Sequence, residues 1–240
     1  EDGFISIEVD PLLCDDVQGT IDEGVRIYKT LGNDNVMIKV PATKAGYVAM
    51  KELTSQGIHV NATLIFSPQQ AIQCARALNE GIQLSNKKPQ AVVSIFVSRF
   101  DRLCDSELVS KGLEKSRLGI INAAKCYHEI NKFSNKNIRT LFASTGVKST
   151  DLPSSYYVDE LLYPNSVNTA PLLTIEDWLI SGKKEEAKVI SEDECDEFFA
   201  QLKLKNVDMP KVYETLLNDG LESFKASFKD LLGKLLSKSH

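Results

Sequence analysis

The residues that build disulfide frameworks and metal centres are scarce in this sequence. Its five cysteines are odd in number, scattered and never in a C-x-x-C spacing (Cys14, Cys74, Cys104, Cys126 and Cys195), so neither a disulfide framework nor a zinc cluster is indicated. Only three histidines occur, with no pair at helical spacing (His59, His128 and His240), which argues against a histidine metal site. We therefore expect no metal and a reducing, cytoplasmic environment.

An excess of positive charge and long apolar runs are also lacking. The formal net charge is -5 and the pI is about 5.4, which argues against nucleic acid and anionic membrane surfaces as partners. No apolar run approaches the span of a bilayer, and the start of the chain lacks the pattern of a signal peptide. Neither G-x-G-x-x-G nor G-x-x-x-x-G-K-[ST] occurs, so no nucleotide-binding loop is indicated.

Apolar residues instead form alternating strand and helix patterns. The 240 residues, 42% of them hydrophobic and 25% charged, suit one large domain with a full-size core. Six segments predict strands: Phe4–Val9, Asn35–Pro41, His59–Phe66, Ala91–Val97, Arg139–Ala143 and Ser166–Thr169. Helices are predicted between them at Thr20–Leu31, Lys44–Gln56, Pro68–Gly81 and Leu113–Phe133. Asp101 and Asp105 are expected in a solvated loop after Arg99.

Strands that alternate with helices predict parallel crossover units, in either a barrel or an open doubly wound sheet. We favour the α/β class and a (β/α)8 barrel of the TIM type, because polar residues recur near the carboxyl ends of successive strands. An open sheet more often gathers such groups at a single switch point. In the strand His59–Phe66, strict alternation would place Asn61 and Thr63 on one face with Ile65, and Leu64 on the other.

Lys39 lies inside one of the apolar strands, which ends at Pro41. Because a buried ammonium is costly, such an amine reaches water, pairs with a carboxylate, or becomes neutral and acts as a nucleophile that forms a Schiff base. The stretch by itself leaves open the simpler alternative that Lys39 only extends to solvent where the strand emerges.

Polar side chains on or just past different strand ends form a candidate site: Glu8, Lys39, Asn61, Thr63, Ser94, Arg99 and Ser144. A neutral amine could attack a ketone, a carboxylate with a hydroxyl could move protons through a water, and a guanidinium could hold a phosphate. A purely structural ion pair between Glu8 and Lys39, and a surface role for Arg99, remain alternatives.

Five segments in this order resemble consecutive motifs of the transaldolase family: Phe4–Pro11, Ile38–Thr43, Gly57–Ser67, Ser94–Arg99 and Ala143–Lys148. The segments Tyr157–Leu161 and Val167–Pro171 extend the match. The motifs therefore cover roughly the first 170 residues. The rest of the chain resembles the family only in its helical character.

The resemblance implies a transaldolase of the pentose phosphate pathway. Such enzymes transfer a dihydroxyacetone unit from sedoheptulose 7-phosphate or fructose 6-phosphate to glyceraldehyde 3-phosphate or erythrose 4-phosphate, with no cofactor. Lys39 matches the Schiff-base lysine, and Glu8 with Thr63 matches the pair that positions a proton-transferring water. The positions matching substrate-binding residues are Asn61, Ser94, Phe96, Arg99 and Ser144, the last two as phosphate ligands.

Two departures from the family pattern stand out. Some members carry a second phosphate arginine where this chain has Gly146, and we expect Lys148 to substitute for it. The family's glutamate strand is the third of eight, whereas here it opens the chain, so the first two βα units, including the strand with a general-acid aspartate, are expected to be missing. An isolated chain of these residues is then expected to expose sheet edges and to be strongly impaired.

We expect residues 1–171 to form barrel units three to eight with the active site. Residues 172–240 are expected to form a helical segment packed on the barrel within the same domain, and the apolar stripe of Pro210–Lys238 suits either core or subunit packing. We expect a monomer or a homodimer that binds sugar phosphates. Alternative functions are a fructose 6-phosphate aldolase, which Phe96 disfavours, and an inactive barrel remnant that only binds sugar phosphates.

Overall fold

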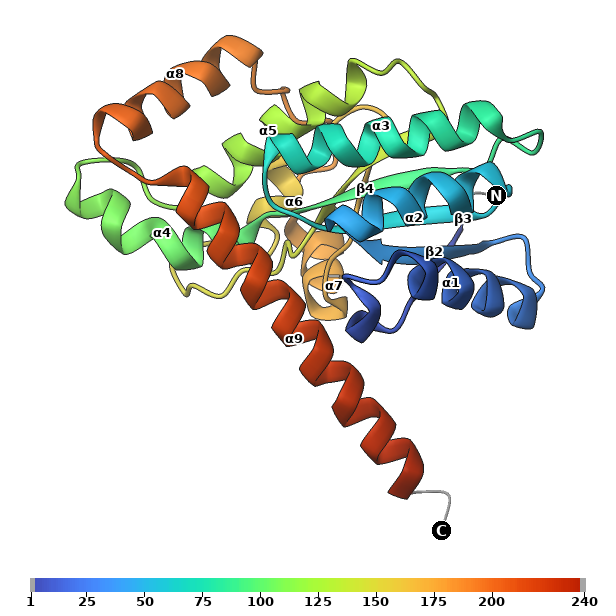
Figure 1. Cartoon of the computed structure of the whole chain (residues 1–240). Coiled ribbons are helices and arrows are strands. Elements are labelled where there is room, and N and C mark those ends of the chain that lie inside the picture. Colours follow the sequence, from blue (N-terminus) through green and yellow to red (C-terminus); the bar gives the residue numbers. More distant parts are fainter. Residues whose placement is uncertain (1–2, 238–240) are drawn as a thin grey trace.

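Six parallel strands form the centre of the protein, whose computed structural model describes residues 3–237 (Figure 1). The strands pair in sequence order: β1 (Ile5–Glu8), β2 (Val36–Pro41), β3 (His59–Ile65), β4 (Ala91–Phe96), β5 (Ile138–Ala143) and β6 (Ser166–Asn168). All five pairings are parallel. This sequential parallel order is that of a TIM-like barrel sheet and confirms the predicted α/β class.

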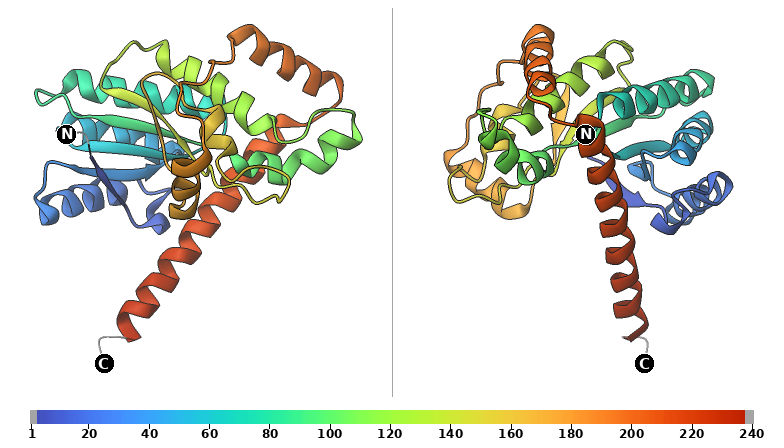
Figure 2. Two further views of the ribbon diagram at one scale, coloured as in Figure 1. Left: turned by 180° about the vertical axis from the view of Figure 1, so that it is seen from behind. Right: turned by 60° about the vertical axis from the view of Figure 1, so that its left-hand side comes forward.

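Helices connect the strands, and further helices form the C-terminal part of the chain after β6. They are α1 (Val17–Leu31), α2 (Lys44–Ser55), α3 (Pro68–Leu84), α4 (Ser98–Ser110), α5 (Leu118–Asn131), α6 (Tyr156–Glu160), α7 (Leu172–Ser181), α8 (Glu192–Leu204) and α9 (Met209–Ser237), with a 3-10 turn at Pro11–Leu13. In both views of Figure 2 the helices α1, α2 and α3 lie side by side along the sheet. No described helix is long and apolar enough to cross a membrane.

Local chemistry sets several helix ends. Ser67 and Gln70 form a reciprocal capping box at the start of α3, where Pro68 occupies the first turn. Asp16 accepts a hydrogen bond from Gly19 N at the start of α1, and Gly32 ends this helix at φ +62°. The start of α3 and the end of α1 were predictable because their capping residues act within one turn of the chain.

Several predictions about helices were wrong. Helix α1 begins at Val17 and not at Thr20, and the helix predicted from Leu113 begins only at Leu118, after the non-helical residues 113–117. Helix α3 does not end at Gly81 but continues to Leu84, because Gly81 is a packing residue: a Cβ there would overlap the Lys51 carbonyl oxygen and the Thr54 hydroxyl of α2. Asp101 and Asp105 are not in a solvated loop but in α4. Asp101 is buried there, and its Oδ1 accepts a hydrogen bond from Gly119 N at 2.9 Å. This carboxylate therefore caps the start of α5 from inside the protein.

The sheet separates two apolar clusters. One lies between the strands and the outer helices and contains Val60, Ala62 and Ile65. The other lies on the opposite side of the sheet under α9 and contains Leu64 and Phe66. The predicted alternation along β3 was therefore wrong from Leu64 onward.

A β-bulge is the reason for this change of face. The β3–β4 register shifts between Ala62 and Ile65, and Leu64 has φ +59°, in the left-handed region. One extra residue lets Thr63 and Leu64 both lie on the inner side, after which Ile65 points outward. Strict alternation cannot reveal such an insertion.

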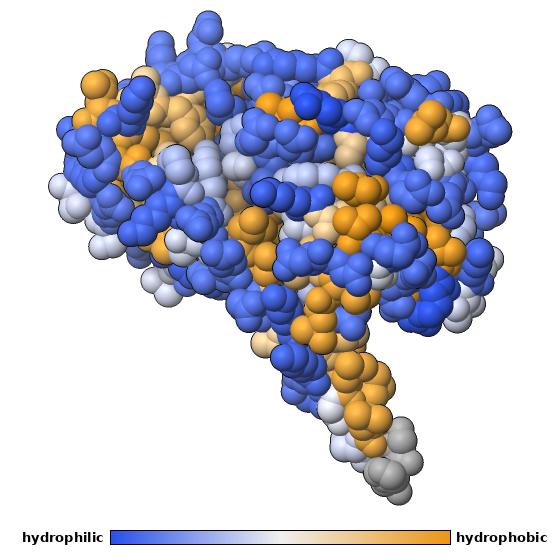
Figure 3. Space-filling model, viewed as in Figure 1, coloured by the Kyte–Doolittle hydropathy of each residue, from blue (hydrophilic) through white to orange (hydrophobic). Residues whose placement is uncertain are grey.

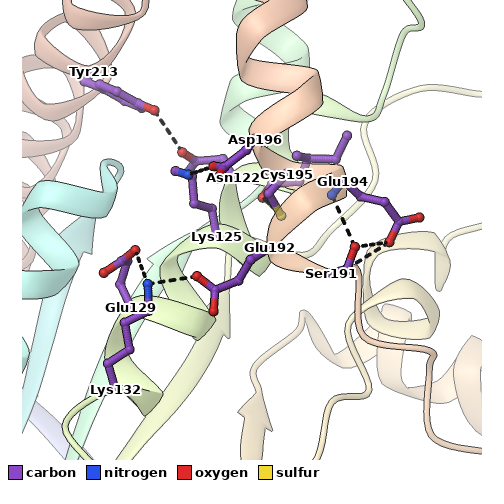
Figure 4. A network of polar contacts seen from close by, with 11 residues as sticks. Asn122, Lys125, Glu129, Lys132, Ser191, Glu192, Glu194, Cys195, Asp196 and Tyr213 are labelled. Atoms are coloured by element: carbon purple, nitrogen blue, oxygen red, sulfur yellow. Dashed lines mark hydrogen bonds and ion pairs between the residues drawn. The ribbon is translucent and has the colours of Figure 1, made fainter.

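Helix α8 is attached to α5 by polar contacts (Figure 4). Lys125 pairs with Asp196, and Lys132 lies 2.8 Å from Glu192 of α8. A capping box between Ser191 and Glu194 starts α8, and Cys195 is buried against α5. These contacts hold the chain on the barrel before it turns into α9.

Helix α9 crosses the body and then projects from it (Figures 1 and 2). Its first part is anchored by Tyr213, whose hydroxyl donates to Asn122 Oδ1 at 3.1 Å, and Asn122 donates to Phe66 O at 2.8 Å. The projecting part carries an apolar stripe that includes the exposed Leu231 and Leu232 (Figure 3).

The helix packing at Gly81 can be tested by an alanine scan of two helical glycines. Gly81→Ala should lower the free energy of unfolding by about 1–3 kcal/mol, because the added methyl group overlaps α2. The matched change Gly233→Ala, at a site in α9 with nothing within 4 Å of the added Cβ, should be neutral or raise it by about 0.5–1 kcal/mol. Urea unfolding measures both, and equal effects would contradict the packing role of Gly81.

Candidate active site

Parallel register brings Glu8 and Lys39 together. The two residues are direct partners on β1 and β2, so their side chains leave the same face of the sheet. Lys39 Nζ lies 3.8 Å from Glu8 Oε2, and both side chains are about one quarter exposed. The amine and the carboxylate thus form a partly shielded pair at the carboxyl ends of their strands.

The environment of Glu8 favours its protonated form. Burial raises the pKa of Glu8 to about 7, and the opposing effect of Lys39 does not cancel it. The buried Glu8 Oε1 and Thr63 Oγ1 have no hydrogen-bond partner within residues 3–237. Both atoms can therefore bind a substrate or a water, and Glu8 can give or accept a proton near neutral pH.

A chain of hydrogen bonds continues across the neighbouring strands. Ser94 Oγ donates to Asn61 Oδ1 at 2.6 Å, and Asn61 Nδ2 donates to Ser6 Oγ at 2.9 Å. Asn61 is also the register partner of Lys39. The amide is thus held in a fixed orientation beside the amine.

These residues line one open cavity of about 470 Å³. Its walls include Lys39, Asn61, Thr63, Ser94 and Phe96. Phe96 packs edge-to-face on Phe66, at 5.3 Å between ring centroids. The cavity therefore combines hydroxyl and amide groups with one aromatic wall.

A second cavity of about 390 Å³ is lined by three cationic residues. Arg99, Arg102 and Lys148 line it together with Ser98 and Ser144. None of these three cations has an ion pair within the described part of the chain. Such a cluster suits a phosphate group.

The two cavities adjoin. Thr169 lines both of them, and the Arg99 guanidinium lies 5.2 Å from the ring of Phe96, which belongs to the first cavity. Burial, reinforced by the Arg102 charge, lowers the pKa of Arg99 below its ordinary value. An anion at this position would relieve the repulsion between the two guanidinium groups.

The backbone around Ser144 is shaped for this second cavity. Ser144 has φ +56° just past β5, and its carbonyl accepts a hydrogen bond from Ser98 N at 3.0 Å. A Cβ at Gly146 would lie 3.0 Å from Pro171 Cγ, so an arginine would require Pro171 to shift. Lys148 reaches the same cavity from an exposed position.

All nine residues that the sequence singled out thus lie in or beside two adjoining cavities, although their catalytic and binding roles stay predictions. Three residues of the site were missed: Ser6, Arg102 and, on α9, Phe224, whose ring centroid lies 5.0 Å from Lys39 Nζ. Arg102 could have been found from its spacing of three residues after Arg99 if α4 had been predicted as a helix.

Comparisons with known proteins point to one family. The family model described as transaldolase/fructose-6-phosphate aldolase matches residues 1–235. The chain is 46% identical over 245 residues to a protein of Campylobacter jejuni (strain RM1221) named transaldolase, covering 98% of this chain and 73% of that protein. It is 45% identical over 230 residues to a transaldolase of Helicobacter pylori (strain ATCC 700392 / 26695), covering 96% and 71%.

Glu8→Gln should flatten the pH dependence of folding stability. Because the pKa of Glu8 rises from 4.5 to about 7 on folding, the folded protein keeps a proton that the unfolded chain releases between these values. This contribution is fully present below about pH 4.5 and is lost as the pH rises through 7, at up to about 1.4 kcal/mol per pH unit.

Urea unfolding from about pH 5 to pH 7 at constant ionic strength measures this slope. Asp101, whose pKa burial also raises to about 7, should leave a residual slope in the variant. Glu52→Gln, an exposed glutamate on α2, serves as the matched control and should keep the full slope. A Glu8→Gln slope equal to that of the control would contradict the raised pKa.

Proposed function

Because this chain belongs to the transaldolase/fructose-6-phosphate aldolase family and its relatives at 45–46% identity are transaldolases, we propose that it is a transaldolase that works through a Schiff base on Lys39. One observation supports this mechanism most directly. The Lys39 amine lies beside the Glu8 carboxylate, on adjacent parallel strands, at the wall of a polar cavity. An amine with a neighbouring proton carrier is what imine formation requires.

The reaction begins with attack of the Lys39 amine on the ketone carbon of the donor sugar phosphate. Loss of water gives the imine, and the adjacent carbon–carbon bond then breaks to release an aldose phosphate. The dihydroxyacetone unit stays on Lys39 as an enamine until it attacks the aldehyde carbon of the acceptor. Water finally adds to the new imine and releases the product ketose phosphate.

Glu8 and Thr63 are suited to the proton transfers of these steps. Glu8, with a pKa near 7, can lose and regain a proton during turnover. The Thr63 hydroxyl is buried on β3, two strands from Glu8 on β1. It can hold a water between the carboxyl group and the substrate. Asn61 and Ser94, already linked to each other, would bind the hydroxyl groups of the dihydroxyacetone unit.

Each cavity would bind a different end of the substrate. The sugar end would occupy the cavity at Lys39, and the terminal phosphate would bind Arg99, Ser144 and Lys148 in the second cavity. We add Arg102 as a further cation of the phosphate site, since it lines the same cavity. Sugar phosphates are therefore the proposed substrates.

A plain aldolase is the second candidate, since the family description includes fructose-6-phosphate aldolase. Phe96 in the cavity wall supports transfer instead, because the resemblance to the family associates a more polar residue at this position with plain aldolases. The two activities differ in whether cleavage of fructose 6-phosphate requires an acceptor aldose.

We also propose a role in the pentose phosphate pathway and a cytoplasmic location. All five cysteines are free and buried, which suits a reducing compartment. A monomer or a homodimer remains the proposed state of assembly.

Lys39 can be tested by trapping. Wild-type protein incubated with fructose 6-phosphate and borohydride should gain one reduced dihydroxyacetone adduct, located on Lys39 by peptide mapping, because borohydride reduces an imine to a stable amine. Lys39→Gln should form no adduct and lose transfer activity. Lys51→Gln, which removes an exposed lysine paired with Glu80 on the outer helices, should still be labelled. An adduct on another lysine would overturn the assignment.

Lys148 can be tested through the Michaelis constant. Lys148→Ala should raise the Michaelis constant for the donor sugar phosphate by about three- to tenfold and change kcat little, because an exposed cation contributes modestly to binding the phosphate. Inhibition by inorganic phosphate should weaken in parallel. Lys136→Ala, another exposed lysine, is the control, and an unchanged Michaelis constant in Lys148→Ala would remove this residue from the site.

A further inference from the structure

Phe224 contacts the amine of Lys39 from a distant part of the chain. The ring centroid of Phe224, on α9, lies 5.0 Å from Lys39 Nζ. The ring also contacts Phe96, at 6.4 Å between centroids and with the rings inclined by 55°. Phe224 and Phe96 therefore extend one aromatic wall from the cavity to the reacting nitrogen.

The position of this ring is fixed by close helix packing one turn earlier. A Cβ at Gly220 would lie 2.9 Å from Leu64 Cδ2 and 3.5 Å from Arg99 Nη1, so the α9 backbone packs closely against these side chains there. Phe224 is four residues further on and lies on the same face of the helix. The anchor at Tyr213, which bonds Asn122 and packs on Phe100 at 6.0 Å between centroids, holds α9 in this position.

A ring in this position shields one side of the amine from water. Lys39 keeps 26% of its side-chain surface exposed, so the cavity side remains open while the α9 side is covered by carbon. The open side admits the substrate and the water that releases the product. The covered side limits the directions from which water can reach an imine on Nζ.

We propose that Phe224 is a positioning residue that covers the Lys39 amine and favours transfer of the dihydroxyacetone unit over its loss by hydrolysis. The inference rests on the proposed Schiff-base function. In hydrolysis the enamine takes up a proton, water adds to the imine carbon and the carbon–nitrogen bond breaks, releasing free dihydroxyacetone and the Lys39 amine. In transfer the enamine instead forms a carbon–carbon bond with the acceptor aldehyde.

The test compares Phe224→Ala and Phe224→Leu with wild type in the full polypeptide. Each protein receives fructose 6-phosphate with a limiting amount of acceptor aldose phosphate, and the measured quantity is free dihydroxyacetone released per ketose phosphate formed. Phe224→Ala should raise this ratio by about threefold, the scale of losing one aromatic contact with a cation, and Phe224→Leu should raise it less. A merely structural loss would lower both products and leave their ratio unchanged.

Phe228→Ala is the matched control, since Phe228 lies one further turn along α9 and is also half-buried. An unchanged ratio in both Phe224 variants, or an equal rise in Phe228→Ala, would overturn the proposal. If circular dichroism shows that Phe224→Ala does not fold, Phe224→Leu decides alone, by a raised or an unchanged ratio. Borohydride labelling of wild type separates the two hypotheses: no adduct on Lys39 refutes the proposed function, whereas an adduct with unchanged ratios refutes only the role of Phe224.

Discussion

The pairing of β1 with β2 in parallel register is the constraint on which the site depends. Because Glu8 and Lys39 are register partners, the backbone hydrogen bonds of the sheet hold a carboxylate and an amine side by side. Taking both groups out of water costs free energy that a 3.8 Å ion pair only partly offsets, and the raised pKa of Glu8 expresses this cost. The pair therefore contributes little to folding stability, but its carboxyl group is well suited to proton transfer near neutral pH.

The bulge in β3 shows how the same sheet accommodates both chemistry and packing. With Leu64 at φ +59°, Thr63 faces the cavity and Leu64 still reaches the cluster under α9. A regular strand would have to give up one of these placements, since consecutive residues point to opposite faces. The strained backbone at Leu64 and at Ser144 thus occurs beside the two cavities, where functional sites commonly hold it.

Helix α9 connects the C-terminal part of the chain to this site. Close approach at Gly220 and the hydrogen bond from Tyr213 to Asn122 set its position, and Phe224 then reaches the amine of Lys39. Polar contacts hold α8, the helix that precedes α9, on α5 (Figure 4). Residues remote from the reacting nitrogen therefore influence its surroundings through helix placement.

The six strands, the starts of α2 and α3, and the choice of Lys39 with the polar residues at the strand ends as a candidate site could be predicted from the sequence. These signals, which are alternation, capping and helical spacing, act over only a few residues. Other features could be seen only in the folded protein. Leu64 lies on the inner side of the sheet, Asp101 is buried, and Gly81 packs against α2. Arg102 and Phe224 lie at the site. Each of these depends on contact between elements far apart in the chain, which no local pattern encodes.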